Sequence, residues 1–142
     1  MTIQFIKLEK DISNENADFL YDLLSKRKFN ISHSKLPTYE EHFKFIESNP
    51  YYAWYIVTLN NQKIGSVYIN RDNSIGLNLL EDHKENYEEI ILQIENFIKP
   101  QKEIKSFRSK NIFFNINPND KYFISILEKL DYVVSKISYR KK

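Results

Sequence analysis

Apolar residues in the N-terminal third of the chain change from an alternating pattern to the three-and-four spacing of a helix. The alternation over residues 3–8 predicts a strand, and the helical spacing over residues 14–24 predicts a helix. A second helix is predicted to begin at Thr38, because Thr38 and Glu41 have the spacing of a capping box, in which each side chain bonds the other residue's backbone amide. Asn49 followed by a proline predicts the end of that helix.

Three apolar segments in the middle of the chain are separated by short polar turns and predict an antiparallel meander. Residues 52–59 and 63–69 form its first two strands. Asn60 and Asn61 join them, and both tolerate the positive φ that a tight hairpin turn requires. Residues 75–80 are expected to form the third strand.

The remaining third of the chain predicts two more helices and two more strands. Apolar residues recur at intervals of three and four over residues 87–98, which is the strongest helix signal in the chain. A strand over residues 112–116 and a helix that begins at Asn119 or Asp120 follow, and weak alternation over residues 132–139 predicts a final strand. The predicted order is β-α-α-β-β-β-α-β-α-β, which places the chain in the mixed α/β (α+β) class.

Composition indicates a folded chain and removes several kinds of chemistry. The 142 residues suit one domain over residues 1–142, and an aromatic content of 15% is far above what a disordered chain carries. The absence of cysteine excludes thiol nucleophiles and disulfides, and three scattered histidines give no metal-site pattern, so no metal is expected. Gly65 and Gly76 are too far apart for a glycine-rich phosphate loop.

The charge of the chain is nearly balanced, since 21 basic and 19 acidic residues leave a formal net charge of +2, and no nucleic-acid partner is expected. The basic segment over residues 99–110 is interpreted as a solvated connector, with an anion-binding patch as the alternative. The N-terminus has no signal-peptide pattern, and no apolar stretch approaches the length of a membrane helix. We therefore expect a cytoplasmic protein with no membrane partner; the oligomeric state stays open.

Several short strings stand out by their order along the chain. They are Trp-Tyr-Ile-Val at 54–57, Gln-Lys-Ile-Gly-Ser-Val-Tyr-Ile at 62–69, Ile-Gly-Leu at 75–77, Asn-Ile-Asn-Pro-Asn-Asp at 115–120 and Leu-Glu-Lys-Leu-Asp-Tyr at 127–132. In this order they resemble the GCN5-related N-acetyltransferase (GNAT) superfamily, and most of all its small bacterial members that acylate amino sugars. Ser-His-Ser at 32–34 and Glu-Glu-His at 40–42 are similar to the substrate side of those sugar enzymes.

The resemblance implies a GNAT-like, mostly antiparallel mixed sheet with helices on both faces. It also implies an acyl-CoA-dependent N-acyltransferase that acts on a small amine, with a nucleotide-linked amino sugar as the candidate. Acetyl-CoA, the implied cofactor, lies in that family where the third and fourth strands of the meander diverge, and its pyrophosphate loop falls here on residues 84–89. The residues implied to bind the cofactor are Leu77, Leu79, His83, Lys84, Asn86 and Tyr87.

Three positions depart from the family pattern. Tyr87 and Glu89 stand where the pyrophosphate loop has glycines, and Leu127 stands where the family commonly has a tyrosine that protonates the leaving thiolate. Side chains in the loop crowd the backbone that must approach phosphate, and Glu88 and Glu89 place negative charge at the start of a helix. The second hypothesis is therefore a catalytically degenerate GNAT-fold binding module that does not use acetyl-CoA.

Five residues are candidates for catalysis or acceptor binding, and each has a purely structural alternative. Asn78 would orient a water beside the thioester, or it is the polar half of an alternating strand; Tyr122 would replace the missing acid, or it is a surface tyrosine. Because imidazole in general titrates near neutral pH, His33 and His42 would contact the amine, or they are surface histidines. Trp54 would stack on a sugar ring, or it belongs to the core.

Overall fold

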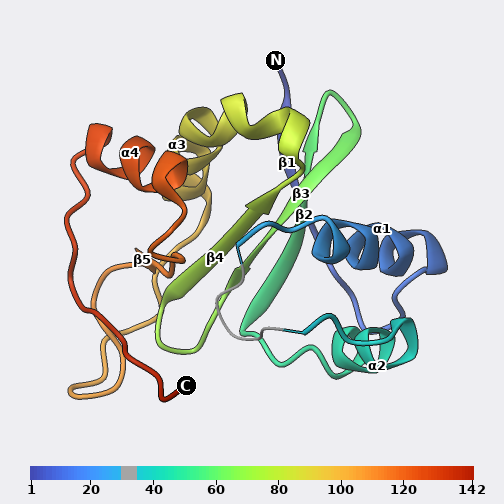
Figure 1. Cartoon of the computed structure of the whole chain (residues 1–142), viewed down its shortest axis with the longest axis horizontal. Coiled ribbons are helices and arrows are strands. Elements are labelled where there is room, and N and C mark those ends of the chain that lie inside the picture. The colour runs from blue at the N-terminus through green and yellow to red at the C-terminus, as the bar shows by residue number, and fades with distance from the viewer. Residues whose placement is uncertain (30–34) are drawn as a thin grey trace.

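The structure is a computed structural model that describes residues 1–29 and 35–142. Its elements in chain order are β1 (Ile3–Lys7), α1 (Asn14–Ser25), α2 (Tyr39–Ser48), β2 (Ala53–Leu59), β3 (Gln62–Ile69), β4 (Ser74–Leu79), the 3₁₀ helix η1 (Glu81–Asn86), α3 (Tyr87–Phe97), β5 (Phe113–Phe114) and α4 (Lys121–Lys129). The predicted order of strands and helices is confirmed from β1 through α4 (Figure 1).

The five strands form one sheet in chain order, β1-β2-β3-β4-β5. The first four strands pair antiparallel, which confirms the predicted meander. The last pair, β4 and β5, is parallel and very short, because only Ser74 with Phe113 and Ile75 with Phe114 are partners. Figure 1 shows β2, β3 and β4 crossing the middle of the molecule.

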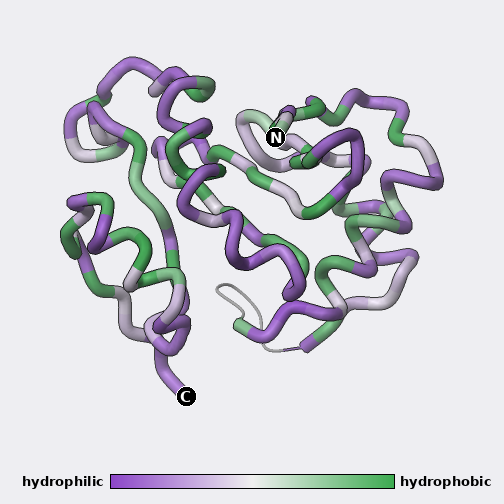
Figure 2. The backbone as a smooth tube through the Cα atoms, turned by 90° about the horizontal axis from the view of Figure 1, so that it is seen from above, coloured by the Kyte–Doolittle hydropathy of each residue, from purple (hydrophilic) through white to green (hydrophobic). Residues whose placement is uncertain are grey.

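Side chains of the sheet point alternately to two hydrophobic clusters, one on each face. Val57, Val67 and Leu77 pack with α3 and α4 on one face. Trp54 and Ile56 pack with α1 and α2 on the other. Figure 2 shows the hydrophobic and hydrophilic residues interleaved along the helices and strands from above. Helices therefore cover both faces of a mostly antiparallel sheet, as predicted.

Local signals at helix ends and turns are confirmed in detail. Thr38 and Glu41 form the capping box at the start of α2. The hairpin between β2 and β3 turns at Asn60 and Asn61, whose φ angles are 50° and 68°. Asp120 caps α4, since its side chain accepts a hydrogen bond from the amide three residues later. These features depend on neighbouring residues alone, which is why the sequence predicts them well.

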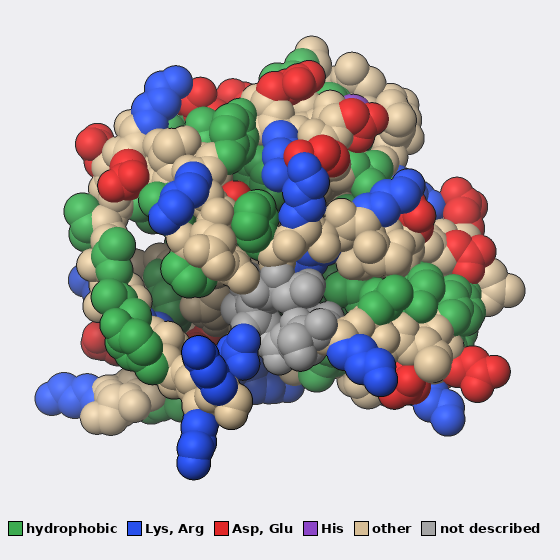
Figure 3. Space-filling view, in the orientation of Figure 1, with side chains coloured by type: hydrophobic (Ala, Val, Ile, Leu, Met, Phe, Trp, Pro, Cys, Tyr) green, Lys and Arg blue, Asp and Glu red, His purple; other side chains and the backbone are tan. Residues whose placement is uncertain are grey.

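The predicted strand over residues 132–139 is wrong, because no strand follows α4 in the described part of the chain. Asp131, at φ 67°, turns the chain at the end of α4. Beyond it, four large apolar side chains are between 71% and 93% exposed: Val133, Val134, Ile137 and Tyr139. Figure 3 shows a column of hydrophobic side chains where Figure 1 places this segment, with an opening between it and the body. An alternating sequence becomes a strand only when it pairs with a strand edge, and this segment does not pair with β5, although the Nζ of Lys136 lies 4.6 Å from the centre of the Phe113 ring.

The basic segment over residues 99–110 is a loop that buried Asn73 holds in place. Asn73 has a φ of 72°, and its side-chain amide donates to the carbonyls of Gln101 (2.9 Å) and Ser109 (2.8 Å). Its side-chain oxygen accepts from the Gln101 amide at 2.9 Å. Both ends of the loop are therefore fixed to the turn between β3 and β4. None of the described helices combines the length and apolar character needed to cross a membrane.

Candidate active site

The centre of the candidate site is the place where β4 and β5 separate. The last backbone hydrogen bond between them runs from the Asn115 amide to the Ile75 carbonyl at 3.1 Å. Because backbone groups of alternate residues face the same side of a strand, Leu77 and Leu79 turn their amides and carbonyls toward the widening gap. This gap, here called the wedge, is the diverging pair of strands that the family resemblance implies.

Tyr87 closes the inner end of the wedge. Its hydroxyl accepts a hydrogen bond from the Leu79 amide at 3.3 Å, and its ring packs on Phe123 of α4 with 4.7 Å between centroids. The wedge holds a cavity of about 40 Å³. Residues that line it include Leu77, Leu79, Lys84, Tyr87, Asn115 and Asp120. A cavity of this size holds little more than a water molecule, so a larger ligand requires the wedge to open.

Charged side chains at the mouth of the wedge are largely paired with one another. Glu81 lies 3.1 Å from the Nζ of Lys28 and 2.9 Å from the Nζ of Lys84. Hydrogen bonds from these two lysines hold the pKa of the Glu81 carboxyl below its usual value. Figure 3 shows the basic and acidic side chains meeting near the middle of this face. Arg27 differs, since its Nε donates to the Phe29 carbonyl and no salt bridge to it occurs within the described residues.

Residues 84–89, the implied pyrophosphate loop, form helix and not an open loop. Lys84 and Asn86 belong to η1, and Tyr87 begins α3 directly. The Tyr87 amide donates to the Lys84 carbonyl, so the two helices are continuous. The departures from glycine explain this difference, because Tyr87 and Glu89 favour helical backbone where glycines would leave the chain free to bend.

A second and larger cavity, of about 300 Å³, lies on the opposite face of the sheet beside α1 and α2. Its aromatic lining consists of His42, Phe45, Tyr51, Trp54 and Tyr68. The rings of Tyr51 and Tyr68 stack with 3.9 Å between centroids and 8° between planes. Gly76 makes this arrangement possible, because a Cβ there would lie 2.1 Å from the Tyr68 ring.

Polar side chains also reach this second cavity, here called the aromatic cavity. Glu41, Lys35 and Arg27 line it together with Asn78. Burial raises the pKa of the Tyr51 hydroxyl far above its usual value, and the charge of Arg27 acts against that rise. Aromatic faces with one carboxylate and two cations suit a ligand that has a flat or ring-shaped body, an amine and an anionic group.

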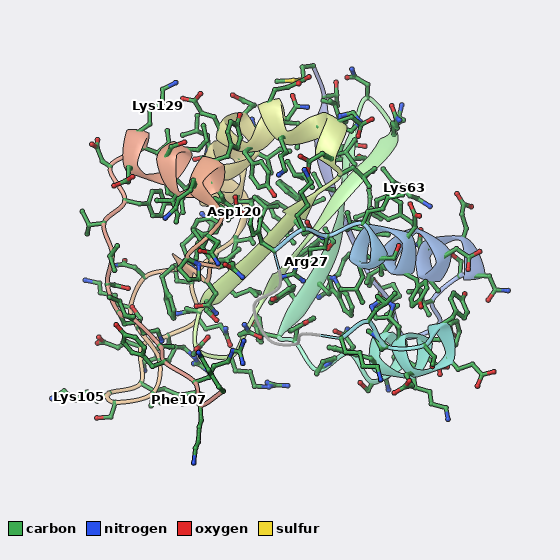
Figure 4. The ribbon with its side chains drawn as sticks, in the orientation of Figure 1. Arg27, Lys63, Lys105, Phe107, Asp120 and Lys129 are labelled. Carbon is green, nitrogen blue, oxygen red and sulfur yellow. The ribbon has the colours of Figure 1, made fainter. Side chains whose placement is uncertain are left out.

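The two cavities share a wall at the end of β4. Leu23, Arg27, Leu77 and Asn78 line both of them. Leu77 and Leu79 belong to the cluster under α3 and α4, so alternation places the Asn78 side chain on the other face, toward the aromatic cavity. Figure 4 shows Arg27 and Asp120 near the middle of the molecule, whereas Lys63, Lys105 and Lys129 lie at its periphery.

The structure brings together most of the residues that the sequence singled out. Leu77, Leu79, Lys84 and Tyr87 line the wedge, and His42, Trp54 and Asn78 line the aromatic cavity. Tyr122, His83 and Asn86 line neither cavity: Tyr122 is 43% exposed on α4, and the Nε2 of His83 lies 4.0 Å from the Asp82 carboxylate. His33 lies outside the described residues.

Sequence reasoning missed several residues that the fold brings to the site. Phe45, Tyr51 and Tyr68 come from three separate segments, and no local pattern joins them. One sequence feature could have pointed to Arg27, because the basic run Lys-Arg-Lys at 26–28 directly follows the helix with an apolar face. Asp120 was identified as a cap and also lines the wedge.

No protein-family model and no curated protein matches this sequence. Solved structures match it by fold. The N-acetyltransferase PseH of Campylobacter jejuni, solved with acetyl coenzyme A, has a TM-score of 0.64 at 11% identity, over 96% of this chain and 92% of its own. The aminoglycoside 6'-N-acetyltransferase AAC(6')-IG of Acinetobacter haemolyticus has a TM-score of 0.54 at 14% identity, over 100% and 98%.

A domain from Methanocaldococcus jannaschii is similar as well, with a TM-score of 0.61 at 16% identity over 96% of this chain and 92% of that one. Each likeness extends over nearly the whole of both chains. The chain described here therefore has the GNAT acetyltransferase fold.

Proposed function

We propose that this chain, a single domain over residues 1–142 with the GNAT fold, is an N-acyltransferase that moves an acyl group from acyl-CoA to a small amine. The observation that carries the proposal is the wall at Asn78, where the wedge and the aromatic cavity adjoin from opposite faces of the sheet. Transfer between two bound molecules requires their reacting atoms to meet, and holding them in contact supplies much of the rate.

The wedge supports binding of the pantetheine arm of such a donor. The arm carries amide groups along its length, and the edge of β4 offers backbone amides and carbonyls at Leu77 and Leu79, as it would to another strand. When bound, the thioester supplies an acyl carbon to which the amine nitrogen bonds, while the carbon–sulfur bond breaks and the sulfur leaves as a thiol with a proton from the amine. Asn115 and Asp120 form the opposite wall of the wedge.

The aromatic cavity supports an acceptor of the amino-sugar type. Trp54, although only 5% exposed, borders the space in which a sugar ring would lie, and Arg27 and Lys35 suit the phosphates of a nucleotide-linked sugar. His42, at the same cavity, is a candidate to contact the amine. We propose that Asn78 orients the amine or a water that accepts its proton, because it borders both cavities.

Tyr122 remains our candidate for the group that returns a proton to the leaving sulfur. Its ring lies 6.4 Å from that of Tyr87, which lines the wedge, although Tyr122 itself lines neither cavity. The lack of cysteine fits a reducing compartment, and we propose a cytoplasmic location for the reaction.

The test is turnover with acetyl-CoA and a panel of small amines, including amino sugars, measured by thiol release and by the mass of the acylated product. Replacing Asn78 with alanine should lower kcat by about a hundredfold, the scale on which a positioned proton-transfer group acts. Asn96→Ala, on the exposed side of α3, is the matched control and should leave kcat unchanged. Equal rates for both variants would remove Asn78 from the mechanism.

A second candidate function is a binding module that does not use acetyl-CoA. The continuous helix over residues 81–97 favours it, because the pyrophosphate loop of the family is not formed there. Calorimetric titration with acetyl-CoA separates the two candidates. No heat at millimolar ligand, together with no turnover, would favour the binding module.

A further inference from the structure

The segment that would bind a nucleotide diphosphate is built for helix formation. A phosphate site at a helix N-terminus needs amides that have no partner inside the helix. Because η1 runs directly into α3, the amides without a partner lie at the start of η1, at Glu81 and Asp82. They do not lie in the implied loop over residues 84–89. Both residues carry carboxylates, which repel phosphate.

The lysines beside this segment are already paired with carboxylates, whereas Arg27 has no salt bridge within the described residues. Lys84, the first residue of the implied loop, pairs with Glu81 at 2.9 Å. Glu88, in the first turn of α3, pairs with Lys129 of α4 at 3.1 Å, and Glu89 adds a second carboxylate in that turn. A diphosphate bound there would have to displace these ion pairs and approach two acidic side chains.

The wedge is different in kind. Its inner walls are the edge of β4, apolar side chains and the side chains of Asn115 and Asn117, with Tyr87 at the inner end. Charged residues line the rest of it: Lys26, Arg27, Lys28, Glu81, Lys84 and Asp120. Strand edges bind amide-bearing chains through alternating donors and acceptors, and they need no charge on the ligand. The Leu79 amide, which the Tyr87 hydroxyl satisfies in this structure, becomes available when that tyrosine moves.

We infer that this chain recognises its acyl donor through the pantetheine thioester and not through the nucleotide diphosphate. The inference rests on the proposed function, and it specifies the donor as an acylated pantetheine arm. Such an arm occurs free, as part of CoA, or attached to a carrier protein, and these sources share the chemistry that the wedge fits.

The kinetic test compares acetyl-CoA, acetyl-pantetheine and an acetylated carrier protein as donors to one amine. We expect kcat/KM for acetyl-pantetheine to lie within about tenfold of that for acetyl-CoA. A fall of about a hundredfold or more on removing the nucleotide would overturn the inference, because it would show that the diphosphate supplies recognition. The experiment with the acetylated carrier protein assigns the source of the pantetheine. A rate at or above that of acetyl-pantetheine indicates a protein-bound donor, whereas the absence of turnover with the carrier protein restricts the donors to small thioesters.

A binding measurement on the full chain decides the same question without catalysis. Calorimetric titration with pantetheine should give heat, and titration with ADP should give none at millimolar concentration. ADP binding tighter than pantetheine would contradict the inference. If no donor is turned over, the proposed function fails, and the comparison of pantetheine with ADP still tests which half of the donor this chain recognises.

Discussion

Tyr87 combines two properties that are usually in conflict, a large buried ring and a polar group that needs a partner. It is 4% exposed, and its ring packs between β4 and α4. The Leu79 amide meets its hydroxyl, so neither group is left unsatisfied. Burial raises the pKa of this hydroxyl far above its usual value, and the charge of Arg27 acts against that rise. The hydroxyl therefore stays protonated at neutral pH.

Replacing Tyr87 with phenylalanine should reduce the free energy of unfolding by about 1–3 kcal/mol, because the Leu79 amide then has no partner at a buried position. Urea denaturation measures this. Tyr122→Phe is the control, since Tyr122 is 43% exposed, and it should change stability by no more than about 0.5 kcal/mol. Equal stability of the two variants would show that the bond to Leu79 contributes nothing.

Asp72 gives the fold a dependence on acid. Its carboxylate accepts hydrogen bonds from the amide (2.9 Å) and the hydroxyl of Ser74. Burial raises the pKa of Asp72, but the hydrogen bonds from Ser74 and the charge of Lys136 together lower it by more than burial raises it. The pKa of Asp72 therefore lies below its usual value. Stability from such a carboxylate is present above the unfolded pKa near ~3.9 and is lost as the pH falls through the folded value.

Asp72→Asn should therefore be less stable than the parent chain at neutral pH and should approach it below about pH 3. Urea denaturation at several pH values gives the comparison. Asp11→Asn, at an exposed position, provides the control and should follow the parent at every pH. A difference between D72N and the parent that does not change with pH would show that Ser74 does not lower this pKa.

At the scale of elements, the exposed segment after α4 has an alternating sequence but does not pack as a strand. Its four exposed apolar side chains make few contacts, so they should contribute little to stability. Val134→Lys and Ile137→Lys should each change the free energy of unfolding by no more than about 0.5 kcal/mol. Leu127→Ala, in the neighbouring helix and 7% exposed, should cost about 2–5 kcal/mol. Losses of similar size in all three variants would indicate that the segment packs against the body.

The prediction that succeeds and the one that fails differ in how far apart the interacting residues are. The Thr38–Glu41 box and the Asn60–Asn61 turn are complete within a few residues, so their sequence determines them. A strand over residues 132–139 would need an edge supplied by another part of the chain, and alternation carries no information about that edge. The same reason applies to the candidate site: the family resemblance points to Leu77 and Asn78 within a single strand, whereas Tyr51 and Tyr68 meet only through the fold.

At the scale of the whole molecule, the proposed function puts the sheet between donor and acceptor. The wedge lies under α3 and α4, and the aromatic cavity lies under α1 and α2, so the two proposed ligands would approach from different sides. Trp54 is the single tryptophan of the chain and lines only the second of these cavities. Its fluorescence is therefore a reporter for one of the two ligands.

Acceptor amines should change the emission of Trp54, and pantetheine compounds should change it much less. Indole emission responds to rings and charges placed against it, and only the acceptor is expected to make that contact. Titration of the full chain with each ligand, followed by fluorescence, gives both responses. A larger change with the donor would place the donor in the aromatic cavity and reverse the assignment of the two faces.

Asn73 holds both ends of the loop over residues 99–110 and leaves the tip of that loop available for chemical attachment. Both ends of the loop are anchored, at Gln101 and Ser109, while Lys105 is exposed between them and lies at the periphery in Figure 4. The chain contains no cysteine, so Lys105→Cys introduces a unique thiol. A dye or a surface tether bound there would sit on an ordered support away from both cavities, which turns this loop into a handle for single-molecule or immobilised assays.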